Sequence, residues 1–280
     1  MAAPSHSSWI SSPRPAPLPA ELEDLRRRGW RGGLVRPHRA FDRLQLRRAD
    51  AITAGLLAVA LSGAWLVAMN QVGRLWIAIF NFWTLRMGWH YAVWVYPAHW
   101  GGLHFVLPYL NLTAPAPDRL FWWSTAAVTI ALWMATLWMS EEAVPWKYLW
   151  RAVLLIQATG LAYFAFAGAQ FPHDLASYTV SMFVFGNVLI AMVPLIFAFT
   201  YYLFDFSLLQ KLGLTLLTML HLMLFLPLQY LVHAWVLHSS ILFMPVLYFA
   251  FGPFLDVLVL ISFYSWGMSW RSRQDRGIAD

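Results

Sequence analysis

Residues 178–204 read YTVSMFVFGNVLIAMVPLIFAFTYYLF, without a single charged side chain. The hydrocarbon core of a bilayer is about 30 Å thick, and a helix needs roughly 20 apolar residues to cross it. No water hydrates the backbone inside lipid, so such a run must satisfy its own hydrogen bonds as a helix. This stretch therefore predicts a transmembrane helix.

Similar apolar runs extend over most of residues 51–268. The chain has 280 residues, of which 60% are hydrophobic and only 11% are charged. It has no cysteine, which excludes disulfides and thiolate metal sites. We predict an all-α, polytopic membrane protein with about six transmembrane helices. The predicted spans cover residues 51–70, 119–140, 148–168, 178–204, 212–235 and 241–268.

The positions of lysine and arginine predict the orientation, because loops rich in these residues stay on the cytoplasmic side. Ten arginines precede Ala51, and the connections and tail on the same side add Lys147, Arg151, Lys211, Arg271, Arg273 and Arg276. The opposite side has only Arg74, Arg86 and Arg119. We therefore expect both termini in the cytoplasm of a bacterium and the spans in its inner (plasma) membrane. Orientation and anionic lipid account for the net charge of +6, so no nucleic-acid partner is predicted.

The segments outside the spans differ in composition. Residues 1–20 are rich in proline, serine and alanine and predict a disordered cytoplasmic tail. Residues 21–50 are basic and predict cytoplasmic surface helices, the second of them amphipathic, although the same charges also fit a plain orienting signal for the first span. Residues 269–280 form a basic cytoplasmic tail. The spans and their loops, 51–268, form the transmembrane domain.

The connection at 71–118 is long and aromatic. Tryptophan and tyrosine prefer the headgroup layer, so we expect this loop to lie along the outer surface or to dip into it. An alternative makes 75–97 a seventh span. That alternative would bury Arg86 and His90 and would reverse every later helix.

Six of the nine histidines fall at the outer interface in this topology. Imidazole and carboxylate groups bind copper, iron or zinc without cysteine. His99 and His104 are five residues apart, as are His233 and His238, and this spacing does not place two side chains on one helical face. There are two alternatives to a metal site. The histidines lie there only because imidazole is stable at a water-exposed membrane interface, or they contact a partner protein. The candidate metal ligands are His90, His99, His104, His173, Asp174, His233 and His238.

A second candidate site lies at mid-membrane. Asp256 is near the middle of the sixth span, and His221 on the fifth span lies at a similar depth, within about 5 Å at 1.5 Å per residue. Intramembrane carboxylates are costly and are often functional. His221 and Asp256 are therefore candidate cofactor-binding residues. One interpretation is that they form a proton or substrate path, and another is that they hold a pigment that has a single histidine ligand. A purely structural hydrogen bond between helices is the alternative.

Three functions remain open from the sequence. The leading hypothesis is a subunit of a larger membrane complex, in which the bilayer and other membrane subunits are the partners. Its outer histidine and aromatic face would dock a partner or help to hold a cofactor. The second is a membrane metalloenzyme built on the outer histidines. The third is a proton-coupled permease that uses His221 and Asp256.

Overall fold

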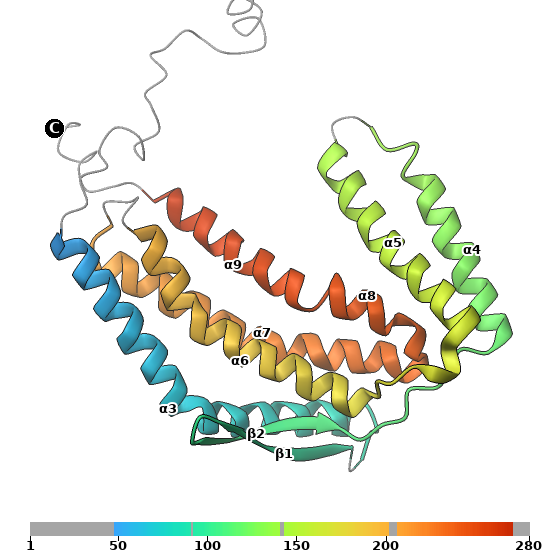
Figure 1. Cartoon of the computed structure of the whole chain (residues 1–280), viewed down its shortest axis with the longest axis horizontal. Helices are drawn as coiled ribbons and strands as arrows, with labels where there is room; N and C mark the ends of the chain where they lie inside the picture. The colour runs from blue at the N-terminus through green and yellow to red at the C-terminus, as the bar shows by residue number, and fades with distance from the viewer. Residues whose placement is uncertain (1–47, 91, 141–142, 202–205, 271–280) are drawn as a thin grey trace, which may run out of the picture. The chain divides into compact units, whose positions relative to one another are not determined.

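The computed structural model describes residues 48–90, 92–140, 143–201 and 206–270, and these residues are mostly helical (Figure 1). Five segments are long and apolar enough to cross a membrane, which supports a multi-pass membrane protein. The predicted tails and most of the predicted surface helices lie outside the described residues. The principal helices are α3 (Arg48–Arg86), α4 (Arg119–Ala135), α5 (Val144–Ala167), α6 (Leu175–Tyr201), α7 (Leu208–Ser239), α8 (Met244–Phe249) and α9 (Pro253–Met268).

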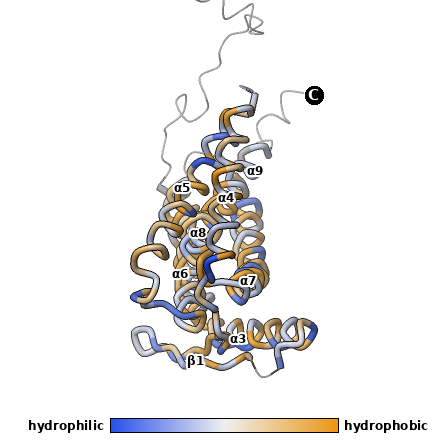
Figure 2. The backbone as a smooth tube through the Cα atoms, turned by 90° about the vertical axis from the view of Figure 1, so that its right-hand side faces the viewer, coloured by the Kyte–Doolittle hydropathy of each residue, from blue (hydrophilic) through white to orange (hydrophobic). Residues whose placement is uncertain are grey.

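The first helix, α3, is much longer than the span predicted at 51–70. Its 39 residues correspond to about 58 Å, roughly twice the thickness of the hydrocarbon core. Figure 1 shows α3 changing direction near its middle, and Figures 1 and 2 both place its second half beside a pair of strands. The predicted outer loop at 71–118 is therefore helical as far as Arg86.

A β-hairpin follows α3, and it corrects the expectation of an all-α chain. Strand β1 (Val93–Trp100) pairs in antiparallel fashion with β2 (Leu103–Leu110). Gly101 and Gly102 connect the strands with φ of 53° and 87°. Two-residue hairpin loops of type I′ need positive φ at both central positions, which glycine adopts without strain. An open sheet edge is not tolerated within lipid, so we place the hairpin outside the hydrocarbon layer.

The hairpin is attached through β2. A Cβ atom on Gly73 of α3 would overlap the carbonyl oxygen of Val106, so the helix and the strand touch backbone to backbone. Leu107 and Leu110 are fully buried. Strand β1 is mostly exposed, and its aromatic side chains Trp94, Tyr96 and Trp100 lie on the surface. The hairpin therefore has one strand, β2, that packs against α3, and one strand, β1, that is mostly exposed.

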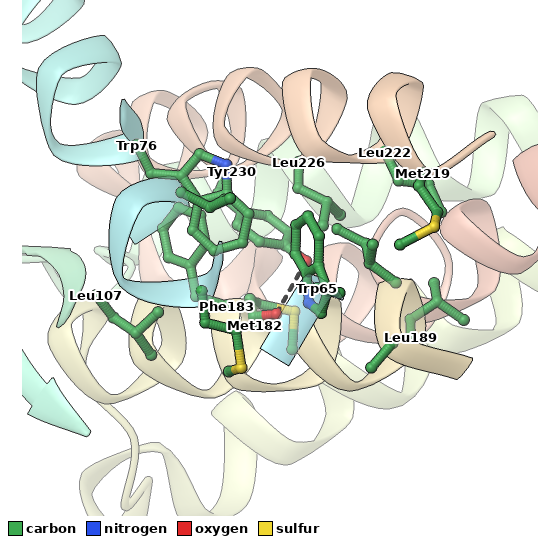
Figure 3. Packing of buried hydrophobic residues seen from close by; sticks show 14 of the residues in the cluster. Trp65, Trp76, Leu107, Met182, Phe183, Leu189, Met219, Leu222, Leu226 and Tyr230 are labelled. Carbon is green, nitrogen blue, oxygen red and sulfur yellow. Dashed lines mark hydrogen bonds between the residues drawn. The ribbon is translucent and has the colours of Figure 1, made fainter. Parts of the chain in front are cut away.

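Helices α6 and α7 form the core together with the second half of α3. The rings of Trp76 and Phe183 stack at 4.8 Å between centroids, and Phe183 meets Tyr230 edge-on at 4.9 Å (Figure 3). The indole Nε1 of Trp76 also donates to the carbonyl oxygen of Met223 at 2.8 Å. These contacts fix α3 against both helices.

Helices α6 and α7 approach closely at Gly186. Lipid tails are as apolar as leucine, so membrane helices associate mainly through close van der Waals packing, which small residues permit. A Cβ atom on Gly186 would lie 2.5 Å from Cδ1 of Leu226 and 3.4 Å from the hydroxyl oxygen of Tyr230. The absent side chain therefore sets the separation of the two helices.

Helices α4 and α5 form a helical hairpin that meets the rest of the chain through α8 and a short 3₁₀ turn, Ile241–Phe243. The predicted span at 119–140 corresponds to α4, whose 17 residues fall short of a full crossing. Asp118 is the N-cap of α4, and its side chain accepts a hydrogen bond from the backbone N–H of Phe121 at 2.6 Å. A 3₁₀ turn at Gly168–Gln170 ends α5.

The predicted span at 241–268 is a broken helix. α8 ends at Phe249 and α9 begins at Pro253, with Gly252 between them. A Cβ atom on Gly252 would lie 2.8 Å from the carbonyl oxygen of Tyr248, so the break requires glycine at this position. Proline then starts α9, where its missing N–H costs nothing.

Candidate functional site

Polar side chains gather inside the apolar core where α6, α7 and α9 meet. Each of them is at least nine-tenths buried. Burying a polar side chain is costly unless it finds a hydrogen-bond partner, so a cluster of buried polar side chains indicates a functional constraint. Its members are Tyr178 on α6, Gln229, Tyr230 and His233 on α7, and Asp256 on α9. We call these five residues the buried polar cluster.

Asp256 lies at the centre of the cluster, in the first turn of α9 just after the helix break. Its side chain is 0% exposed, and the polar side chains that face its carboxyl group are Gln229 and Tyr230. The hydroxyl of Tyr230, however, donates to the carbonyl oxygen of Met182 at 3.0 Å (Figure 3). Within the described residues, neither carboxyl oxygen of Asp256 has a hydrogen-bond partner.

Gln229 lies beside the carboxyl group, and its amide is held by the helix break. Its side-chain Nε2 donates to the carbonyl oxygen of Phe251 at 2.6 Å, in the break between α8 and α9. A carbonyl oxygen can only accept, and this fixes which end of the amide points toward it. The Oε1 atom of Gln229 is left without a partner in the described residues.

The cluster therefore brings three unpaired acceptor oxygens into one buried place, two from Asp256 and one from Gln229. Acceptors do not stabilise one another, and the energetic penalty of an unsatisfied group is largest in an environment of low dielectric constant. A proton on the Asp256 carboxyl would supply the missing donor, and a small cation would act in the same way. The arrangement is thus suited to take up a positively charged species.

Tyr178 and His233 complete the cluster on the side of the α6 N-terminus. The Tyr178 hydroxyl and His233 Nδ1 are 2.7 Å apart, and the histidine tautomer decides which of them donates. The ring of Tyr230 lies 5.9 Å from that of His233. His233, predicted as an outer metal ligand, is thus a buried partner of a tyrosine.

His221 does not join Asp256. The structure places the His221 side chain on an exposed face of α7, with its ring 5.5 Å from Phe225 and 5.0 Å from Phe263. Phe263 is seven residues, about 10 Å, beyond Asp256 along α9. The similar depth suggested by the sequence therefore does not lead to contact, because Gln229 and Tyr230, two turns further along α7, face the carboxyl group instead.

The predicted outer ligands are dispersed rather than gathered. His90 bonds through Nδ1 to the carbonyl oxygen of Gly88 in its own turn, at 3.1 Å. His173 lies against Phe171, and His238 meets the ring of Trp89 at 5.3 Å. The described part of the chain contains no group of three or more histidine, aspartate or glutamate side chains placed to hold a metal ion. The seven predicted ligands therefore do not form a single centre.

Asp174 has a structural role at the start of α6. Its Oδ1 accepts a hydrogen bond from the backbone N–H of Ser177 at 2.7 Å, the geometry of a helix N-cap. Hydrogen bonding to the side chain and then to the backbone of Ser177 holds the pKa of Asp174 below its ordinary value. This carboxylate is thus already engaged by the helix end.

His99 and His104 are the one pair of predicted histidine ligands that the described residues bring together. They face each other across the hairpin, with their Nδ1 atoms 2.6 Å apart and both side chains exposed. Sequence reasoning treated their spacing as helical and so missed the pairing. The signal was present in Gly101–Gly102, a dipeptide typical of two-residue hairpin loops.

Two further polar side chains on the apolar helices lie apart from the unpaired oxygens of Asp256 and Gln229. Asn187 donates through Nδ2 to the carbonyl oxygen of Phe183 on its own helix, at 3.0 Å. Gln157 on α5 is buried, and both polar atoms of its side chain lack partners in the described residues.

Sequence reasoning identified Asp256 but missed Tyr178, Gln229 and Tyr230. Tyrosine is common near membrane interfaces, so its presence in an apolar run carries little signal. Comparisons of the chain with protein-family models, with curated proteins and with solved structures found no match.

Proposed function

We propose that the chain is a proton-coupled permease and that Asp256 is its proton-binding group. One observation carries this proposal: a carboxyl group fully buried in an apolar core, in the first turn after a helix break, with no hydrogen-bond partner for either oxygen among the described residues. Discontinuous helices with polar groups near the membrane midplane are how many secondary transporters build their sites.

The proposed cycle alternates between two states of Asp256. When the carboxyl group is protonated, its O–H donates to Oε1 of Gln229, and the cluster is satisfied without charge. Loss of the proton leaves a buried anion beside the unpaired acceptor of Gln229, which favours opening of the site to water or to a cationic substrate. The break at Gly252 is the hinge that such an opening needs.

The test uses the purified chain in liposomes that contain a pH-sensitive dye. Pools of small metabolites (amino acids, sugars, organic acids and polyamines) are added outside, and the internal pH is followed. We expect at least one pool to drive a pH change with the wild type and none with Asp256→Asn. Asp174→Asn is the matched control, because that carboxylate is exposed and should leave transport intact. A wild type that moves no protons with any pool, or normal flux in Asp256→Asn, contradicts the proposal.

A second candidate function is a subunit of a larger bacterial inner-membrane complex, as the sequence first indicated. The observation that favours it is strand β1, whose outer edge and aromatic side chains have no covering element among the described residues. Exposed edge strands and exposed tryptophan and tyrosine are typical docking features. The test is purification from native membranes in mild detergent, followed by identification of companion proteins. A stoichiometric companion that is lost when Trp94 and Tyr96 are replaced by serine supports docking, and a monomer without companions refutes it.

A further inference from the structure

The two facing histidines of the β-hairpin form a geometric unit separate from the buried polar cluster. His99 lies directly opposite His104 in the strand register, one pair before the turn. Their rings are 4.7 Å apart at an interplanar angle of 84°, so the nitrogen atoms converge. Both side chains are exposed, and an ion can reach them from water.

The backbone holds this pair in place before any ligand arrives. Gly101 and Gly102 close the hairpin in a two-residue turn that fixes the register. Proline has no N–H, so Pro97 and Pro108 must occupy non-hydrogen-bonded positions of the ladder. His99 is two residues from Pro97 along the strand, so its pair with His104 belongs to the same class. Side chains approach most closely in such pairs.

The short distance between the two nitrogens has a chemical meaning. At 2.6 Å, one Nδ1 must carry a hydrogen and the other must present its lone pair, because two lone pairs would repel. A metal ion in the same place is bound by both lone pairs, and the hydrogen moves by exchange with water from Nδ1 to Nε2 of the same ring. Metal–imidazole bonds of about 2.0–2.1 Å then need only a small outward rotation of the rings.

We propose that His99 and His104 form a two-imidazole binding site for a divalent transition-metal ion of the Cu²⁺, Ni²⁺ and Zn²⁺ class, with water in the remaining positions. Two neutral nitrogen ligands suit these ions and not Mg²⁺ or Ca²⁺, which prefer oxygen. Cu²⁺ binds most tightly in this series, because affinities follow the Irving–Williams order. The site does not depend on the proposed proton transport.

The experiment titrates the full chain in detergent, without a histidine tag, with Cu²⁺ and separately with Mg²⁺ by calorimetry. We expect one Cu²⁺ per chain and no binding of Mg²⁺. His99→Gln and His104→Gln should each weaken Cu²⁺ binding by about tenfold or more, because a single imidazole remains. The electron paramagnetic resonance spectrum of bound Cu²⁺ should show two nitrogen ligands in the wild type and one in either variant.

His90→Gln and His173→Gln are matched controls, since both histidines are exposed and neither faces another histidine in the part of the chain that the structure describes. They should bind Cu²⁺ like the wild type. The hairpin variants replace exposed side chains, so size-exclusion profiles and circular dichroism should stay unchanged. Absence of Cu²⁺ binding in the wild type, unaltered affinity in both hairpin variants, or an equal loss in the controls would overturn the proposal.

Discussion

At the residue scale, Asp256 differs from an ordinary structural carboxylate because, among the described residues, no donor is placed in hydrogen-bonding geometry with its carboxyl oxygens. Gln229 donates to Phe251, and Tyr230 donates to Met182. A carboxylate kept for stability would be expected to accept at least one of these hydrogen bonds. The geometry therefore favours a functional role for Asp256 over a structural one. The two roles predict opposite effects on stability when the carboxylate is removed.

Replacing Asp256 by asparagine should leave thermal stability unchanged or raise it. The asparagine amide keeps the shape of the side chain and supplies a donor to the unpaired Oε1 of Gln229. The melting temperature in detergent, measured by fluorescence or light scattering, checks this. A clear fall in the Asp256→Asn variant would indicate instead that the carboxylate holds the helices together.

At the element scale, the attachment of the hairpin to α3 rests on a missing side chain. Gly73→Ala should destabilise the protein by about 1–3 kcal/mol, because the new Cβ overlaps backbone that cannot move without displacing β2. Gly63→Ala on the same helix is the matched control. It has no atom within 4 Å of the added Cβ and should stabilise the helix by about 0.5–1 kcal/mol. Equal effects of the two substitutions on thermal unfolding would show that β2 does not press on Gly73.

The start of α6 should depend on pH through Asp174. Hydrogen bonds to Ser177 lower the pKa of Asp174 in the folded chain from its ordinary 3.8. A lowered pKa means that the cap contributes its stability above that ordinary value and loses it as the pH falls through the folded value. Hydrogen exchange at the Ser177 amide should therefore gain an additional acceleration below pH 3.8 in the wild type.

Asp174→Asn is the control for this effect, since asparagine caps a helix but does not titrate. The additional acceleration should be absent in that variant. Its persistence would assign the pH dependence to some other group.

The elements that could be predicted from the sequence are those fixed by long apolar runs. Residues 175–201 and 208–239 are helices because lipid leaves the backbone no other solution. The hairpin was missed because its residues are as aromatic as an interfacial loop, and only Gly101–Gly102 marks the turn. The partners of Asp256 were missed for a different reason. Nearly all faces of α6, α7 and α9 are apolar, so periodicity does not reveal which face meets which neighbour.

At the scale of the whole molecule, contacts between distant segments show which helix ends lie together at the same end of the molecule. The N–H of Ile241 donates to the carbonyl oxygen of Pro115 at 3.0 Å, so the start of α4 and the end of α7 lie together. Ser140 follows the opposite end of α4. The predicted orientation then places Ser239 at the outer face and Ser140 at the cytoplasmic face.

A chain without cysteine allows this orientation to be tested one position at a time. We expect a membrane-impermeant maleimide to label Ser239→Cys in intact cells and Ser140→Cys only after the membrane is opened, because both side chains are exposed at opposite ends of the helices. Unmodified protein is the control for background. The reverse pattern would mean that the orientation predicted from the positive charges is inverted, which would also move the hairpin histidines away from the outer face. Strand β1 begins at Val93, so a seventh span at 75–97 is not the way in which this inversion would arise. Labelling of both positions from the same side would show that the α4–α5 hairpin does not traverse the bilayer, in agreement with the short length of α4.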